Sequence, residues 1–119
     1  MKRTQLQFIT DILDAMTHAE SFISALSLED LENDVRTQWA LERAFGIIGE
    51  AAKKIDPELK DQYPELPWRD IAGMRDFLVH GYWMVNLEII IDTIRIDFPK
   101  HKPIFEQILR ELQAAEGEE

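Results

Sequence analysis

The feature that most constrains the fold is a long run of helical periodicity between residues 34 and 55. Apolar residues recur there at three- and four-residue spacings, which is the period of an α-helix and not of a strand. The central apolar stripe consists of Leu41, Phe45, Ile48, Ala52 and Ile55, and further alanines and isoleucines widen it. A helix with so broad an apolar face has to pack against two or more neighbours. The segment therefore predicts a helical bundle.

Two glycines, Gly46 and Gly49, lie inside this segment. Each costs about 1 kcal/mol relative to alanine in the interior of a helix. We expect that cost to be offset by the close approach of another helix, either from the same chain or from a second copy.

The rest of the chain repeats the same periodicity. Ser27 can cap a short helix, because a serine oxygen accepts from a backbone N–H of the first turn. Longer helices are predicted over residues 4–25, 68–80, 86–97 and 104–114. Gly81 is placed to end the helix over residues 68–80. Pro99 and Pro103 are expected to break the chain before the helix over residues 104–114. The prediction is an all-α, up-and-down bundle of four to five helices in a single domain, residues 1–119, with an acidic tail over residues 115–119.

Composition limits the function in two ways. The 119 residues include no cysteine, which excludes a disulfide framework, a thiolate zinc site and a cysteine nucleophile. Thirteen Lys and Arg against 23 Asp and Glu give a net charge of −10, and an acidic chain is a poor general nucleic-acid binder because phosphate contacts dominate that affinity. Any chemistry on RNA must then depend on a small cationic site or on the surface of a partner.

The sequence also bears on location. No apolar run approaches the roughly 20 residues of a membrane span. Asp11 and Asp14 interrupt the N-terminal stretch where a signal peptide needs an unbroken apolar run. The chain is therefore expected to be soluble and cytoplasmic.

The candidate site lies in residues 74–83, which read MRDFLVHGYW and contain the pattern R-x4-H-x-Y formed by Arg75, His80 and Tyr82. Histidine accepts or donates a proton near neutral pH. Arginine supplies a permanent, fork-shaped cation that suits phosphate oxygens. Together they could carry out acid–base chemistry on a phosphodiester without a metal ion.

The spacing of this pattern leaves two interpretations open. Residues five apart on a straight helix lie about 140° apart, so Arg75 and His80 do not share a face, but two-fold pairing with a second copy would bring both residues of both chains to one cleft. Alternatively, a histidine just before Gly81 simply favours the helix dipole, and Arg75 beside Asp76 is an ordinary surface pair.

Other kinds of site are less well supported. The three histidines lie on separate segments without metal-ligand spacing, no carboxylate has the Glu-x-x-His spacing of di-iron bundles, and the serines have no adjacent base. The aromatic residues near the motif, Trp68, Tyr82 and Trp83, could stack on bases, although packing at a helix end is the favoured interpretation.

Three stretches of the chain resemble a known family. They are LERAFGIIGEAAKKI (residues 41–55), YPELPWRDIAGMRDFLVHGYW (residues 63–83) and Asn86-Leu87, and they are similar to the HepT-like branch of the HEPN superfamily of small helical ribonuclease toxins. The resemblance extends over nearly the whole chain. The residue after the motif arginine is often Asn in that family and is Asp76 here.

The resemblance implies a specific function. It implies a homodimer with Arg75 and His80 at the interface. It also implies an endoribonuclease that needs neither a metal ion nor a cofactor. The substrate would be RNA, and tRNA is one candidate. It also implies a type VII-like toxin–antitoxin pair, in which a minimal nucleotidyltransferase antitoxin transfers AMP to Tyr82 and so silences the toxin. A nucleotide on Tyr82 would cover the cleft.

The mechanism expected from these residues is acid–base cleavage of RNA. His80 would act as general base on the ribose 2′-OH or as general acid on the leaving 5′-oxygen, and two copies could divide those roles. Arg75 would stabilise the charge on the phosphorane, with Asp76 as a supporting residue that orients Arg75 or His80. The products would be a 2′,3′-cyclic phosphate and a 5′-hydroxyl. The alternative is a non-catalytic helical subunit that binds a nucleotidyltransferase or a nucleotide through the same face.

Overall fold

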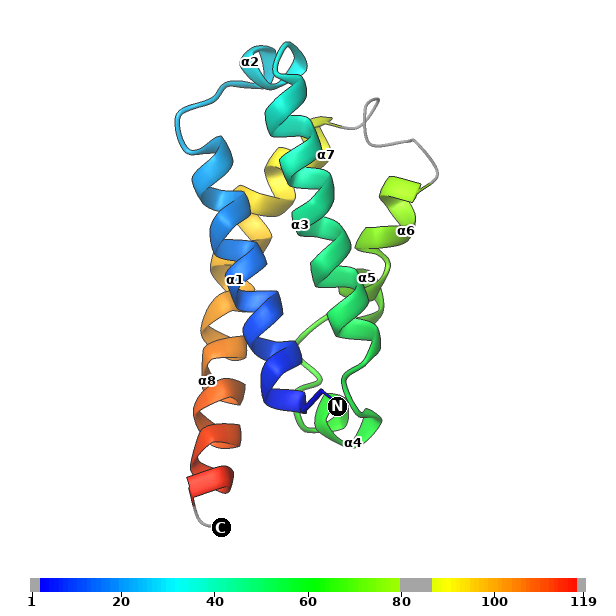
Figure 1. Cartoon of the computed structure of the whole chain (residues 1–119), viewed down its shortest axis with the longest axis vertical. Helices are drawn as coiled ribbons and strands as arrows, with labels where there is room; N and C mark the ends of the chain where they lie inside the picture. Colours follow the sequence, from blue (N-terminus) through cyan, green and yellow to red (C-terminus); the bar gives the residue numbers. More distant parts are fainter. Residues whose placement is uncertain (1–2, 80–86, 118–119) are drawn as a thin grey trace.

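The computed structural model describes residues 3–79 and 87–117 and is built from helices throughout these ranges (Figure 1). In chain order the elements are α1 (Gln5–Ile23), α2 (Leu28–Glu32), α3 (Val35–Lys53), α4 (Pro57–Gln62), α5 (Trp68–Ala72), α6 (Met74–Val79), α7 (Leu87–Asp92), the π-helical turn η1 (Thr93–Asp97) and α8 (Phe98–Gly117). The predicted all-α bundle is confirmed. None of the helices in the described ranges combines the length and the apolar character needed to cross a membrane.

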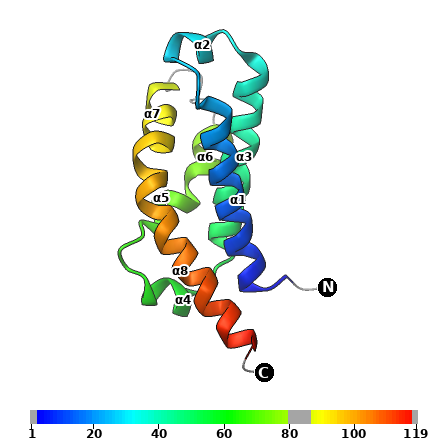
Figure 2. The same cartoon turned by 90° about the vertical axis from the view of Figure 1, so that its left-hand side faces the viewer.

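Helices α1 and α3 form the centre of the bundle and run antiparallel. The side chain of Gln5, at the start of α1, holds the other end of α3: its Nε2 donates to the Lys54 carbonyl oxygen at 3.2 Å, and its Oε1 accepts from the Asp56 N–H at 2.7 Å. Helix α8 and η1 pack along α1, and α7 lies against α2, whereas α5 and α6 pack on α3 (Figures 1 and 2). Helix α3 is thus covered from several sides.

The helix starts follow from capping residues. Thr4 begins α1 with a reciprocal pair of hydrogen bonds to Gln7, and Ser27 begins α2 in the same way with Asp30. Asp34 begins α3, where its carboxylate accepts from the Thr37 N–H at 3.0 Å and from the Thr37 hydroxyl at 2.7 Å. These bonds, led by the one from the backbone N–H, hold the pKa of Asp34 below its usual value. The predicted start at Ser27 is confirmed, and of the two residues expected to begin the next helix, Asn33 and Asp34, the cap is Asp34.

The core consists of the predicted apolar stripes. The stripe of α3 is buried along its whole length, and the ring of Phe45 lies 5.8 Å from that of Phe98. Apolar residues of the segment after residue 86 are buried as well: Leu87, Ile90, Ile91, Ile94 and Phe98. Gln38 is a buried polar side chain, and its amide donates to the carbonyl oxygens of Leu31 and Glu32. That pair of bonds ties α2 to α3.

The predicted single helix over residues 68–80 is wrong, because the chain breaks at Gly73 into α5 and α6. The Gly73 N–H still donates to the Arg69 carbonyl oxygen at 3.0 Å and so ends α5. Both α5 and α6 pack against α3. Residues 80–86, including the expected helix end at Gly81, lie outside the described ranges.

The predicted break at Pro99 and Pro103 is also wrong, since α7, η1 and α8 follow one another without a gap from Leu87 to Gly117. The Phe98 N–H donates to the Thr93 carbonyl oxygen, which is the longer spacing of a π-helical turn. Such a turn locally widens a helix just where Pro99 cannot donate and its ring needs room. Helix α8 then runs three residues beyond the predicted end at residue 114.

The two glycines of α3 have different surroundings. A Cβ on Gly49 would lie 2.8 Å from both the Cβ and the backbone nitrogen of Arg75, and 3.1 Å from the Ala72 carbonyl oxygen. The expected close approach of a helix from the same chain is therefore confirmed at Gly49. A Cβ on Gly46 would meet no atom within 4 Å. Nothing in the described part of the chain explains a glycine at that position.

We predict opposite effects of the two alanine substitutions. Gly49→Ala should lower the free energy of unfolding by about 1–3 kcal/mol, because α6 must move away from α3 to admit the methyl group. Gly46→Ala adds the same atoms to the same helix without a clash and should not destabilise the single chain. Urea unfolding at low protein concentration measures both values, and equal losses for the two variants would contradict the account.

Candidate functional site

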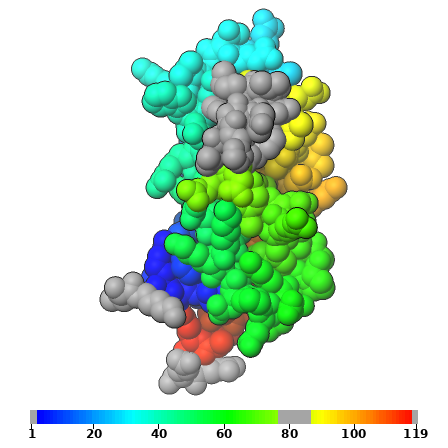
Figure 3. Space-filling model, turned by 90° about the vertical axis from the view of Figure 1, so that its right-hand side faces the viewer, coloured from blue at the N-terminus to red at the C-terminus, as the bar shows by residue number. Residues whose placement is uncertain are grey.

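The candidate site is built where α6 meets the C-terminal half of α3. Helix α6 has only six residues, and Arg75 and Asp76 lie in its first turn. Its backbone contacts Gly49 of α3, and this contact places the side chains of Arg75 and Asp76 next to α3. This part of the molecule reaches the surface on the face shown in Figure 3, between α3 and the α7 segment.

Two ion pairs join these helices. The guanidinium of Arg75 pairs with the carboxylate of Glu50, and these side chains are 48% and 42% exposed. One turn further along α3, the Lys53 Nζ lies 3.2 Å from the Asp76 Oδ1. Consecutive residues of α6 are therefore held by α3 residues three apart, which share a face of that helix. Asp76 forms its ion pair with Lys53. The carboxylate that pairs with Arg75 is that of Glu50.

A groove of about 520 Å³ lies between α1 and α3, and Glu50 is one of its lining residues. Its charged and titratable lining residues are Arg3, Asp11, Asp14, His18, Arg43, Glu50 and Lys54. These are three cations and three carboxylates beside one histidine, so the groove is close to neutral in a chain of net charge −10. The surface beside Arg75 is thus less repulsive to an anion than the chain as a whole.

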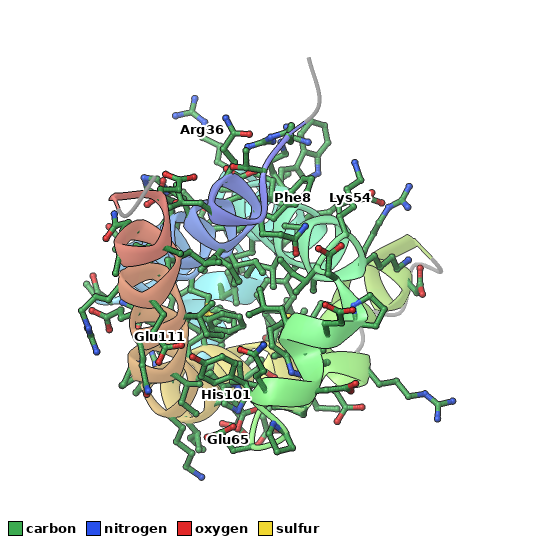
Figure 4. All side chains as sticks on the ribbon, turned by 90° about the horizontal axis from the view of Figure 1, so that it is seen from below. Phe8, Arg36, Lys54, Glu65, His101 and Glu111 are labelled. Atoms are coloured by element: carbon green, nitrogen blue, oxygen red, sulfur yellow. The ribbon has the colours of Figure 1, made fainter. Side chains whose placement is uncertain are left out.

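Aromatic and ionic contacts order the floor of this groove. The Arg3 guanidinium lies 2.8 Å from the Asp11 carboxylate and 5.4 Å from the centre of the Phe8 ring. The Lys54 ammonium lies 5.8 Å from the same ring, and Figure 4 shows these two side chains near each other. Both cations stay close to the ring face, where the π electrons attract them.

The two described histidines do not contact Arg75. His18 is exposed on α1 and stacks on Phe22 with ring centres 6.2 Å apart. His101 is half buried in α8 and lies on the opposite side of the molecule from Phe8 in Figure 4. Burial lowers the pKa of His101. Among the described residues, no three His, Asp or Glu side chains are arranged to hold a metal ion.

Comparison with known families decides what kind of protein this is. A sequence model of the family described as "Ribonuclease HepT-like" matches residues 12–108. The chain belongs to the HepT-like ribonuclease family. The resemblance found in the sequence is thereby confirmed, and the match includes every residue of the R-x4-H-x-Y pattern.

Individual members of the HepT-like family match over almost their full lengths. "Probable ribonuclease HepT" of Thermococcus cleftensis is 40% identical over 108 residues, which cover 91% of this chain and 98% of that protein. "Putative RNase MJ1216" and "Putative RNase MJ0125" of Methanocaldococcus jannaschii are 33% and 34% identical over 94% of this chain, and over 93% and 97% of their own lengths. No solved structure matches the chain.

The structure describes only part of the predicted site. It places Arg75 and Asp76 on α6, against α3. His80 and Tyr82 lie outside the described residues, so their roles stay predictions.

Sequence reasoning missed Glu50. The signal for it was present, because Gly49 indicated the close approach of another helix. The residue next to such a glycine points about 100° away from it around the helix, so its side chain can flank the approaching helix. What the sequence did not indicate is that the approaching residue would be Arg75.

Proposed function

We propose that this HepT-like protein is an endoribonuclease that cleaves RNA without a metal ion, with Arg75 and His80 as catalytic residues. Family membership supports the substrate class. The observation that carries the proposal is the position of Arg75: its backbone is fixed against Gly49 while its guanidinium is half exposed. A permanent cation that is held in place yet open to solvent suits a phosphodiester group.

The proposed reaction is an internal transesterification. The ribose 2′-oxygen attacks the adjacent phosphorus and gives its proton to a general base, and the 5′-oxygen leaves with a proton from a general acid. The products are a 2′,3′-cyclic phosphate and a 5′-hydroxyl. His80 supplies one of the two proton transfers, and His80 of a second copy can supply the other. Arg75 stabilises the negative charge that builds up on the phosphorane.

The acidic surface favours a narrow range of substrates. With a net charge of −10 the protein repels most RNA, so binding has to come from a few local contacts. The groove between α1 and α3 is close to neutral and includes Glu50, the partner of Arg75, so it offers RNA a surface with little repulsion beside the site. We propose a structured RNA as substrate, with tRNA as the first candidate.

We expect the purified protein, freed of any tyrosine modification, to cleave RNA in EDTA and to leave cyclic-phosphate ends. His80→Ala and Arg75→Ala should each lower the rate by about 10²–10⁴-fold, since they remove proton transfer and charge stabilisation. His101→Gln, which replaces a half-buried histidine of α8 outside the groove, is the control and should retain the native rate. Product ends are identified by mass spectrometry.

Two outcomes would contradict this proposal. If the native protein leaves RNA intact, the alternative of a non-catalytic interaction or nucleotide-binding subunit becomes the better one. If all variants cleave RNA equally, the activity belongs to a contaminant or to another site.

We further propose that the working form is a homodimer with the site at its interface. The residues Val35, Trp39, Gly46 and Glu50 lie within about 60° of one another around α3, at 100° per residue. Val35 and Trp39 are 60% and 71% exposed, and Gly46 has room for a close neighbour. A second copy on this face would cover an exposed apolar surface and would reach Glu50 and Arg75.

A charge placed on this face should separate the copies. Trp39→Glu is expected to turn a dimer into a monomer in sedimentation equilibrium and to abolish RNA cleavage, because it buries a carboxylate in an apolar contact. Ile96→Glu changes another large apolar residue, 51% exposed on η1, and should leave the dimer intact. A Trp39→Glu protein that stays dimeric would contradict the proposed interface.

The proposed regulation is AMP transfer to Tyr82 by a minimal nucleotidyltransferase partner, the antitoxin of a type VII-like pair. The phenol oxygen attacks the α-phosphorus of ATP, pyrophosphate leaves, and the phenol loses its proton. The chain contains two tyrosines, and Tyr63 is only 6% exposed in the core. Its burial leaves Tyr82 as the tyrosine for an enzyme to reach. A nucleotide two residues from His80 would block access to it.

Coexpression with such a nucleotidyltransferase should add one adenylyl group and stop RNA cleavage. Intact-mass measurement should show the addition in the native chain and in Tyr63→Phe, but not in Tyr82→Phe. An adenylyl group found on Tyr82→Phe would contradict the proposed acceptor, and full cleavage by the modified native protein would contradict the blockade.

A further inference from the structure

Glu50 is the carboxylate that the structure places on Arg75, and neither the sequence pattern nor the family description assigns it a role. We infer that Glu50 is a positioning residue, which fixes the direction of the Arg75 guanidinium over the face of α3. This inference depends on the ribonuclease proposed above.

The backbone contact at Gly49 explains why a positioning residue is needed. It fixes where the Arg75 side chain starts, because the Arg75 Cβ and nitrogen both rest on α3. Beyond Cβ the side chain has several free torsions, and half of it is exposed to water. The carboxylate of Glu50, on the residue next to Gly49, restrains those torsions. Backbone and guanidinium of Arg75 are thus anchored by neighbouring residues of one helix.

The second ion pair of these helices serves as an internal comparison. Lys53 and Asp76 join α3 to α6 just as Glu50 and Arg75 do, one helical turn away. Their contact fixes how α6 is rotated on α3, but it does not involve the guanidinium. Only the Glu50 pair acts on the group that is to meet the phosphate.

The donor count of a guanidinium leaves room for both partners. Arginine carries five N–H donors, and an ion pair formed through Nη1 leaves those of Nε and Nη2 free for phosphate oxygens. Glu50 therefore orients Arg75 and still leaves N–H donors of the guanidinium free for a phosphate.

The negative charge of Glu50 has a second effect. It repels a bound phosphate, so it does not improve the affinity for RNA. Its benefit should be seen in the rate of the chemical step, where the direction of the guanidinium matters most.

The kinetic test is Glu50→Gln, which removes the charge and keeps the shape. We expect kcat to fall about tenfold or more, because a misdirected group costs rate steeply. KM should stay the same or fall, since a repulsive charge has been removed. Glu20→Gln is the matched control: it removes a partly exposed carboxylate from an ion pair with Lys102, outside the groove and the site, and should leave kcat unchanged. Glu50→Asp keeps the charge and should recover part of the loss.

A second measurement does not require catalysis. In protein labelled with ¹⁵N-arginine, the Arg75 Nε–H signal, identified by its absence in Arg75→Lys, should report an ordered side chain. Glu50→Gln should make that signal mobile on the nanosecond timescale, and Glu20→Gln should not. If Glu50 only stabilised α3, Glu50→Gln would lower the melting temperature but would not change the Arg75 signal more than those of the other arginines.

The outcomes separate the two proposals. If the native protein cleaves no RNA but Glu50→Gln still frees the Arg75 side chain, the ribonuclease proposal fails and the positioning contact stands. A rise in kcat/KM for Glu50→Gln would show that the carboxylate blocks Arg75, which overturns the inference. An unchanged kcat, a loss confined to KM, or an Arg75 signal as ordered as in the native protein would overturn it as well.

Discussion

The contact between Gly49 of α3 and the backbone of Arg75 is the interaction on which the candidate site depends. The two helices approach so closely that no side chain larger than glycine's hydrogen fits between them. The chain gives up about 1 kcal/mol of helix stability at this position. Because of this close approach, the first turn of α6 lies next to α3, and its two residues Arg75 and Asp76 can form ion pairs with Glu50 and Lys53.

This arrangement bears on how so acidic a protein could act on RNA. Charges near the site are paired or nearly balanced: Glu50 with Arg75, Lys53 with Asp76, and, along the neighbouring groove, three cations with two further carboxylates. The excess of negative charge therefore lies elsewhere on the surface. In the proposed ribonuclease, a phosphate would meet a locally balanced surface with one oriented guanidinium, while long-range repulsion would exclude most other nucleic acid.

The sequence was sufficient where local physics decides the structure. The apolar stripe of α3 and the caps at Ser27 and Asp34 were predictable because they depend on periodicity and on near neighbours. The continuity through Pro99 was not, because a π-helical turn accommodates the ring and single-residue propensities do not encode such a turn. The break at Gly73 was missed for a related reason, since packing of α6 on α3 outweighs the helical pattern.

The candidate site was predictable in part. The type and spacing of Arg75 and His80 indicated phosphodiester chemistry, and family membership supports it. The partner of Arg75 was not predictable, because Glu50 lies on another helix and surface carboxylates are common in this chain. Only the packing at Gly49 distinguishes Glu50 from the others.

The most direct test of the account is a crystal structure of the protein with a 2′-O-methyl RNA oligonucleotide, which lacks the attacking hydroxyl. We expect two copies of the chain, with a phosphate on the free N–H groups of Arg75 and Glu50 still on the other edge of the guanidinium. An RNA strand that is bound elsewhere, with no phosphate at Arg75, would contradict the central claim.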